Sequence, residues 1–221
     1  MGYNLPMHIE NEWVKTTLAD FLEAIPSDYP YFALGSLVLL SYTENFYTRP
    51  IRDIDLIGDT HGTDKLGAVL LDKGYAQNTF IDSKFPLAHK LQAIGKKKYL
   101  RFEKNGRALE IMTSNLTAND GSIDVELYPG IAVSMSESAV QNTRYQGLEF
   151  RAVSPEALFC IYNFGLKTWG TLVKTRIEQR RRDLAALHKI VQPYALTRIA
   201  DNVHLKIGRS RIKIPSKLIT T

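Results

Sequence analysis

The spacing of apolar residues predicts a helix at the start of the chain and a buried strand after it. Over residues 10–25 the apolar side chains recur at helical spacing, and Pro26 ends that pattern. Residues 31–34 form a short apolar run that is typical of a strand. A second apolar run, residues 36–41, has the length of a short helix and follows Gly35 directly. We therefore expect Gly35 at a turn that connects a strand to a helix.

A second predicted strand, residues 53–57, carries two acids on one face. Its residues alternate so that Asp53 and Asp55 share one side and Ile54 and Leu56 share the other. We expect the apolar side to pack into the core and the acidic side to face a site or solvent.

A β-hairpin is predicted around Asn105 and Gly106. The flanking runs, residues 99–103 and 108–112, are strand-like, and a two-residue turn of this kind needs positive φ at both central positions. Alternation along the second strand places Glu110 on the side away from its apolar neighbours. A third acid is therefore expected on a strand.

The chain changes character near residue 153. Residues 118–147 are rich in polar and turn-forming residues and give no clear assignment, and residues 148–153 have the pattern of a strand. Helical spacing then extends from 154 to about 192, with a break near Trp169, and Pro193 is expected to end it. The basic stretch that follows has the pattern of an edge strand or a loose tail. We predict a mixed domain over 1–153 and a helical domain with a basic tail over 154–221.

Composition indicates a compact soluble protein. Of 221 residues, 44% are hydrophobic and 23% are charged, and the single cysteine, Cys160, lies in an apolar run that favours a buried thiol. No stretch of 18 apolar residues occurs, so we expect a cytoplasmic protein that does not associate with a membrane. The net charge of +5 makes polyanionic partners such as nucleotides or RNA plausible.

The acids have the spacing of a metal site for phosphoryl or nucleotidyl transfer. This chemistry brings several carboxylates together so that a divalent metal can neutralise triphosphate charge. Asp53 and Asp55 would repel each other without a cation between them. Glu110 is the first candidate for a third acid, and Asp124 or Glu126 is the alternative. Oxygen ligands of this kind suit Mg²⁺ or Mn²⁺.

The predicted turn at Gly35 and Ser36 suits a phosphate group. Glycine allows the backbone to approach an anion closely, and the amide groups at a helix start attract negative charge. The Ser36 hydroxyl is a further donor.

The order of these features resembles the polymerase-β-type nucleotidyltransferase superfamily. A strand, Gly-Ser, a helix and Arg-x-x-x-Asp-x-Asp are present as Gly35, Ser36, Arg49, Asp53 and Asp55. The resemblance is narrower to the AbiEii-like (DUF1814) branch of bacterial toxin and phage-defence nucleotidyltransferases. It implies that the two aspartates bind metal ions, that Gly35 and Ser36 hold a triphosphate, and that Arg49 helps to bind the nucleotide.

A second motif of the same branch, Arg-x-Lys-Asp-x-x-Asp-Leu, is similar to the segment that begins at Arg180. Arg182 stands at the lysine position and Asp183 at the first aspartate, while Ala186 replaces the second aspartate. The lysine that the branch carries on the preceding helix is missing from its place, and Lys167, about a turn later, is the candidate substitute. The resemblance implies nucleotide-binding roles for Lys167, Arg180, Arg182 and Asp183, although the arginines also have the pattern of a solvated helix face.

The resemblance implies a small mixed sheet flanked by helices, with a helical region after it. It also implies an Mg²⁺-dependent enzyme that moves a nucleoside monophosphate from an NTP to an acceptor. The basic charge favours tRNA, another RNA or a protein as acceptor, and the toxin branch implies an antitoxin protein as partner. One alternative is an antibiotic-type enzyme that modifies small molecules, which predicts an acidic pocket for cationic aminoglycosides. The other is a non-catalytic module that binds nucleotide or nucleic acid.

Overall fold

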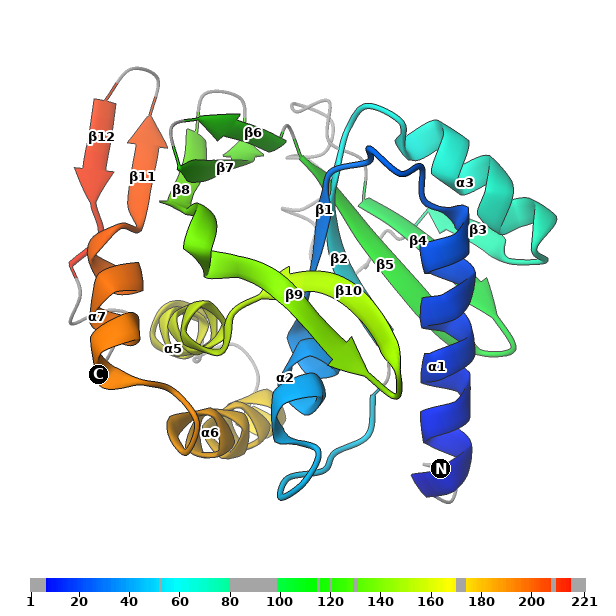
Figure 1. The fold of residues 1–221 in the computed structure, drawn as a ribbon, viewed down its shortest axis with the longest axis horizontal. Coiled ribbons are helices and arrows are strands. Elements are labelled where there is room, and N and C mark those ends of the chain that lie inside the picture. The colour runs from blue at the N-terminus through cyan, green and yellow to red at the C-terminus, as the bar shows by residue number, and fades with distance from the viewer. Residues whose placement is uncertain are drawn as a thin grey trace.

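The computed structural model describes residues 7–51, 53–79, 99–114, 116–119, 121–128, 131–169, 174–207 and 210–215. Within these ranges the chain folds into two β-sheets with helices packed around them (Figure 1). None of the described helices has the length and apolar character needed to cross a membrane. The predicted mixed α/β class is confirmed.

The larger sheet is built from seven of the described strands. They are β1 (Tyr31–Leu34), β2 (Asp53–Asp59), β3 (Ala76–Thr79), β4 (Tyr99–Lys104), β5 (Arg107–Ser114), β9 (Val140–Tyr145) and β10 (Leu148–Val153), in the spatial order β3, β4, β5, β2, β1, β10, β9. β2 runs parallel to β5 and β1 runs parallel to β10, whereas the other neighbours are antiparallel. The predicted hairpin is present between β4 and β5, with φ of +56° at Asn105 and +75° at Gly106.

The helices lie on both sides of this sheet. Those described are α1 (Met7–Ala24), α2 (Gly35–Thr43), α3 (Thr63–Asp72), α5 (Pro155–Trp169), α6 (Lys174–His188) and α7 (Pro193–Asp201), with a short 3-10 turn, η1 (Glu137–Ala139). The predicted break near Trp169 falls between α5 and α6. The expectation that Pro193 ends the helical region is wrong. Pro193 begins α7 instead, because the first turn of a helix does not use the N–H group that proline lacks.

One face of the large sheet is apolar and is covered by α1 and α3. Ile54 aligns with Leu109, Leu109 aligns with Phe102, and these three side chains are fully buried. The ring of Phe102 lies against α3. Arg107, on the same side of β5, lies over the ring of Trp13 in α1, with its guanidinium carbon 5.0 Å from the ring centroid. The acids alternate with these residues and therefore point to the opposite face.

The smaller sheet takes in the first part of the region that the sequence pattern did not assign, and η1 and β9 of the larger sheet make up the rest. Its described strands are β6 (Leu116–Asn119), β7 (Ser122–Tyr128), β8 (Ile131–Ser136), β11 (His204–Ile207) and β12 (Ser210–Lys213), in the spatial order β12, β11, β8, β7, β6. All of its described pairs are antiparallel. The basic stretch near the carboxyl end, for which an edge strand and a loose tail were both open, forms the β11–β12 hairpin. β12 is one of the two outer strands among those described in this sheet.

The region after residue 153 packs closely against the part before it. α5 contacts α6 and α7, and α2 contacts both α5 and α6 (Figure 1). Cys160 is buried in α5, as expected, and burial raises the pKa of its thiol to about 12. The division into two domains at residue 153 remains a prediction.

Candidate active site

The three predicted acids lie together on one face of the large sheet, opposite the face that α1 and α3 cover. Asp55 on β2 pairs in register with Glu110 on β5, and Asp53 lies two residues before Asp55, so the three side chains share one face. One carboxylate oxygen from each of them lies within 4.8 Å of one from each of the others. The alternative third acid, Asp124, lies on β7 of the other sheet in an ion pair with Lys206, and the side chain of Glu126 is outside the described residues.

The closeness of these acids changes the proton affinity of Asp55. Burial, followed by the charges of Asp53 and Glu110, raises the pKa of Asp55 to about 7, while Arg180 and Arg49 oppose the increase. Three carboxylates that converge in this way are suited to hold a divalent cation, because its charge removes their mutual repulsion. Their oxygen donors fit Mg²⁺ or Mn²⁺.

Gly35 allows the turn between β1 and α2, which is predicted to bind phosphate, to lie close to Asp55. Its φ is +79°, and a Cβ atom at this position would lie 2.1 Å from Oδ2 of Asp55. A larger residue would therefore need both an unfavourable backbone conformation and movement of the carboxylate. α2, which is described along its whole length, has neither a side-chain cap at Leu34 nor an acid in its first turn. Its first amide groups are therefore available to an anion beside the acids.

Arg49 connects this turn to α6. Its Nη1 donates to Oδ2 of Asp183 at 2.6 Å, and its Nη2 contacts the hydroxyl of Ser36. The side chain of Asp183 is only 1% exposed, and its Oδ1 also accepts from Tyr47 at 2.6 Å and from Gln179 at 2.9 Å. Asp183 therefore holds Arg49 against the turn that would bind phosphate.

The remaining predicted basic residues are placed differently. Arg180 stacks on Tyr162, with 3.5 Å between its guanidinium carbon and the ring centroid, and its charge acts on Asp55. Arg182 is exposed on α6. Lys167 belongs to α5, but its side chain is outside the described part of the structure. Nucleotide-binding roles for these three residues stay predictions.

Some residues of the site carry little signal in the sequence and were not predicted. Arg101 on β4 pairs in register with Glu110, and its Nη1 donates to Oε1 of Glu110 at 2.7 Å. Counting back along the hairpin from its two-residue turn would have placed Arg101 opposite Glu110. Tyr47 and Gln179 carry no comparable signal, because their contact with Asp183 joins a loop to a helix that is distant in sequence.

The comparisons with known proteins identify the fold. No protein-family model and no curated protein sequence matches the chain. Among solved structures, the antibiotic-resistance factor ANT(2'')-Ia matches with a TM-score of 0.56 and 14% identity, covering 85% of this chain and 89% of its own. The same enzyme in complex with adenylyl-2''-tobramycin gives a TM-score of 0.55 and 14% identity over 82% and 91% of the two chains. The lincosamide antibiotic adenylyltransferase LnuA, bound to lincomycin, gives 0.54 and 19% over 82% and 96%. The chain therefore has the nucleotidyltransferase fold that these enzymes share.

Proposed function

We propose that this protein is an Mg²⁺-dependent nucleotidyltransferase that moves a nucleoside monophosphate from an NTP to an acceptor. The observation that carries the proposal is the cluster of Asp53, Asp55 and Glu110 within 4.8 Å, beside the turn at Gly35. LnuA, which shares the fold, is an adenylyltransferase by name, which makes ATP the first donor to test.

The residues of the chain divide the reaction between them. Gly35 and Ser36 bind the triphosphate through the start of α2, and Arg49 adds a cation that Asp183 holds in place. Asp53, Asp55 and Glu110 would hold Mg²⁺, which would offset the negative charge of the triphosphate and of the attacking oxygen.

The transfer itself forms one bond and breaks one. The acceptor oxygen bonds to the α-phosphorus of the NTP, and the bond from that phosphorus to the bridging oxygen breaks, so pyrophosphate leaves. We propose that Glu110 also takes the proton of the acceptor hydroxyl.

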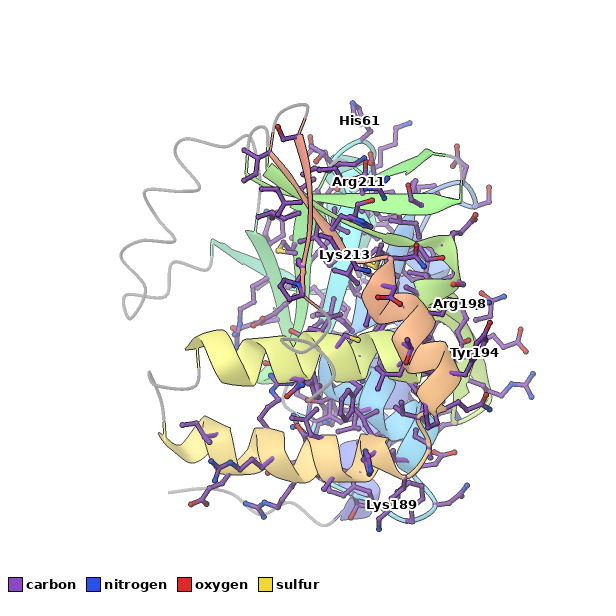
Figure 2. All side chains as sticks on the ribbon, turned by 90° about the vertical axis from the view of Figure 1, so that its left-hand side faces the viewer. His61, Lys189, Tyr194, Arg198, Arg211 and Lys213 are labelled. Atoms are coloured by element: carbon purple, nitrogen blue, oxygen red, sulfur yellow. The ribbon has the colours of Figure 1, made fainter. Side chains whose placement is uncertain are left out.

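A macromolecular acceptor, RNA such as tRNA or a protein, fits the charge of the molecule best. The net charge is +5, and Arg198 on α7 and Arg211 on β12 are exposed along one side of the molecule (Figure 2). Positive charge of this kind favours a polyanion such as RNA. The resemblance to the AbiEii-like (DUF1814) branch supports a role as the toxin of a toxin–antitoxin or phage-defence system, with an antitoxin protein as partner.

A small antibiotic is the second candidate acceptor. It is favoured by the molecules bound in structures that share the fold, lincomycin in LnuA and adenylyl-2''-tobramycin in ANT(2'')-Ia. Against a cationic aminoglycoside, both Glu110 of the cluster and Glu103 beside it on β4 are paired with Arg101, so their negative charge is already offset. A non-catalytic module that binds nucleotide is the remaining alternative.

The test is transfer of label from each α-labelled NTP in Mg²⁺, offered in turn to total RNA, to lysate protein and to an aminoglycoside or lincosamide. We expect labelled RNA or protein with the wild type and at least about a thousandfold less with Asp53→Asn/Asp55→Asn, because the metal site is lost. Asp72→Asn, an exposed acid at the end of α3, is the matched control and should keep full activity.

The size of the labelled product identifies the acceptor class. Label on the antibiotic alone would replace the macromolecular acceptor with the small-molecule one. Nucleotide binding without transfer to any acceptor would favour the non-catalytic module.

A further inference from the structure

Arg101 lies in a row of residues that crosses the sheet through the acid cluster. The register aligns Leu34 on β1 with Asp55 on β2, Asp55 with Glu110 on β5, and Glu110 with Arg101 on β4. Gly35 follows Leu34 directly, so the turn that would bind phosphate and Arg101 lie at opposite ends of this row. The acids lie between them.

This order assigns a side to each reactant. In transfer to the α-phosphorus, the entering oxygen and the leaving pyrophosphate lie roughly in line on opposite sides of that phosphorus. If the triphosphate lies at Gly35, pyrophosphate leaves toward that end of the row, and the acceptor arrives from the other end. Arg101 therefore lies on the acceptor side, next to Glu110.

The guanidinium of Arg101 is fixed between two acids. Its Nη1 donates to Glu110 at 2.7 Å and its Nε donates to Glu103 at 2.5 Å, and its side chain is 27% exposed. Arginine is suited to this position, because its planar group presents donors in fixed directions to two carboxylates at once.

The contact with Arg101 restricts a side chain that would otherwise be more mobile than the two aspartates. Glutamate has one more rotatable bond than aspartate, so its carboxylate loses more conformational freedom when it is held in one place. The two aspartates of the cluster are shorter and lie on the neighbouring strand. A cation that binds Glu110 from the side away from the two aspartates, as Arg101 does, holds its carboxylate in place. The same cation also weakens the attraction of that carboxylate for a metal ion, because it offsets the negative charge.

We propose that Arg101 is a positioning residue for the transfer reaction: it fixes the carboxylate of Glu110 on the acceptor side of the cluster and competes with the metal for it. This inference rests on the proposed function, because it assumes that the cluster binds a metal and an NTP. The proposal predicts opposite effects on metal affinity and on the rate of transfer. Loss of Arg101 strengthens metal binding and slows transfer.

The test is a double-mutant cycle between Arg101→Ala and Glu110→Gln, with Mn²⁺ binding measured by electron paramagnetic resonance and transfer measured from the labelled NTP. We expect Arg101→Ala to bind Mn²⁺ about two- to fivefold more tightly, the effect of one partly exposed ion pair. Its transfer rate should fall about tenfold or more, with the KM for NTP little changed. In the Glu110→Gln background, Arg101→Ala should change both quantities much less, the remaining effect being its weaker interaction with Asp53. Arg101→Lys should recover part of the rate, since lysine keeps the positive charge but lacks the planar guanidinium that binds two carboxylates at once.

Arg107→Ala is the matched control. It removes the same charge from the same hairpin, but Arg107 lies over Trp13 on the opposite face of the sheet. It should leave Mn²⁺ affinity and transfer unchanged.

Weaker Mn²⁺ binding in Arg101→Ala with a lower melting temperature would overturn the proposal, because a purely structural role predicts that result. An equal effect with and without Glu110, or no effect at all, would also overturn it. If the wild type binds Mn²⁺ but transfers no label, the proposed function fails instead, and the Mn²⁺ cycle still decides whether Arg101 acts on Glu110.

Discussion

Gly35 combines a left-handed backbone conformation with close contact to a carboxylate of the acid cluster. Gly35→Ala would place a methyl group 2.1 Å from Oδ2 of Asp55 at a φ of +79°. We expect a loss of about 1–3 kcal/mol in the free energy of unfolding from the backbone alone. We also expect about a 100-fold loss of transfer, because Asp55 must move. Thermal unfolding and the label-transfer assay measure the two effects.

Gly147 is the matched control for this substitution. It has a similar φ, +85°, but a Cβ atom there would meet nothing within 4 Å. Gly147→Ala should therefore show the same loss of stability with full activity. Equal activity in the two variants would contradict the role given to Gly35.

Asp55 makes the stability of the metal-free protein depend on pH. Its pKa is raised from 3.8 to about 7 in the folded state, so between these values the folded protein binds more protons than the unfolded one. The stabilising effect of the protonated form is complete below pH 4 and is lost as the pH rises through 7. We expect the melting temperature in EDTA to fall from pH 5 to pH 8 in the wild type, and to fall less in Asp55→Asn.

Magnesium provides the second half of this experiment. At pH 8 it should raise the melting temperature of the wild type, because a bound cation offsets the repulsion between the acids, and it should have little effect on Asp55→Asn. The prediction fails if the two proteins respond equally to pH and to Mg²⁺.

At the scale of elements, the contact between α6 and the loop after α2 depends on one buried acid. Asp183 is 1% exposed and binds Arg49, whose side chain is 20% exposed. Asp183→Ala should cost about 2–4 kcal/mol in the free energy of unfolding, because it leaves a largely buried guanidinium without its carboxylate. Denaturant unfolding measures this cost.

An exposed pair on α7 and β12 gives the comparison. Asp201 binds Lys213 at 2.8 Å with both side chains about half exposed. Asp201→Ala should cost less than about 1 kcal/mol. Similar costs for the two substitutions would mean that the Asp183 network does not hold α6 in place.

The elements that the sequence predicts correctly are those with a strong local pattern. The alternation around Asp53 and the turn at Asn105 each depend on neighbouring residues, and these local patterns are enough to place the two aspartates and Glu110 on strands. The pairing of β8 with β11 in the smaller sheet has no such signal, because the two strands are about 70 residues apart in sequence. The contacts of Arg101 and Asp183 depend on pairing between elements, which propensity and periodicity do not contain.

At the scale of the whole molecule, the carboxyl-terminal hairpin connects the two predicted domains. β11 pairs with β8, and Lys206 on β11 forms an ion pair with Asp124 on β7. Strands from both sides of residue 153 therefore share one sheet. We expect a single cooperative transition in scanning calorimetry, with a calorimetric enthalpy equal to the van't Hoff enthalpy.

Lys206→Met should lower the temperature of that single transition without dividing it. The substitution removes the ion pair at Oδ2 of Asp124. Because Oδ1 of the same carboxylate is already buried without a hydrogen bond among the described residues, the whole carboxylate would then lack a partner there. Two separate transitions in the wild type would instead mean that the regions 1–153 and 154–221 unfold independently.

The parallel pairing of β2 with β5 also determines when the site forms during folding. Parallel strands need a long crossover, and here it includes α3, β3 and β4, so Asp55 and Glu110 meet only after a large part of the chain is ordered. The β4–β5 hairpin, by contrast, brings Arg101 to Glu110 through local contacts and can form early. Glu110 would then carry its cation before it meets the two aspartates, which would lower the repulsion between the three acids as the site forms. A metal ion that binds only the completed cluster would slow unfolding and leave the folding rate unchanged.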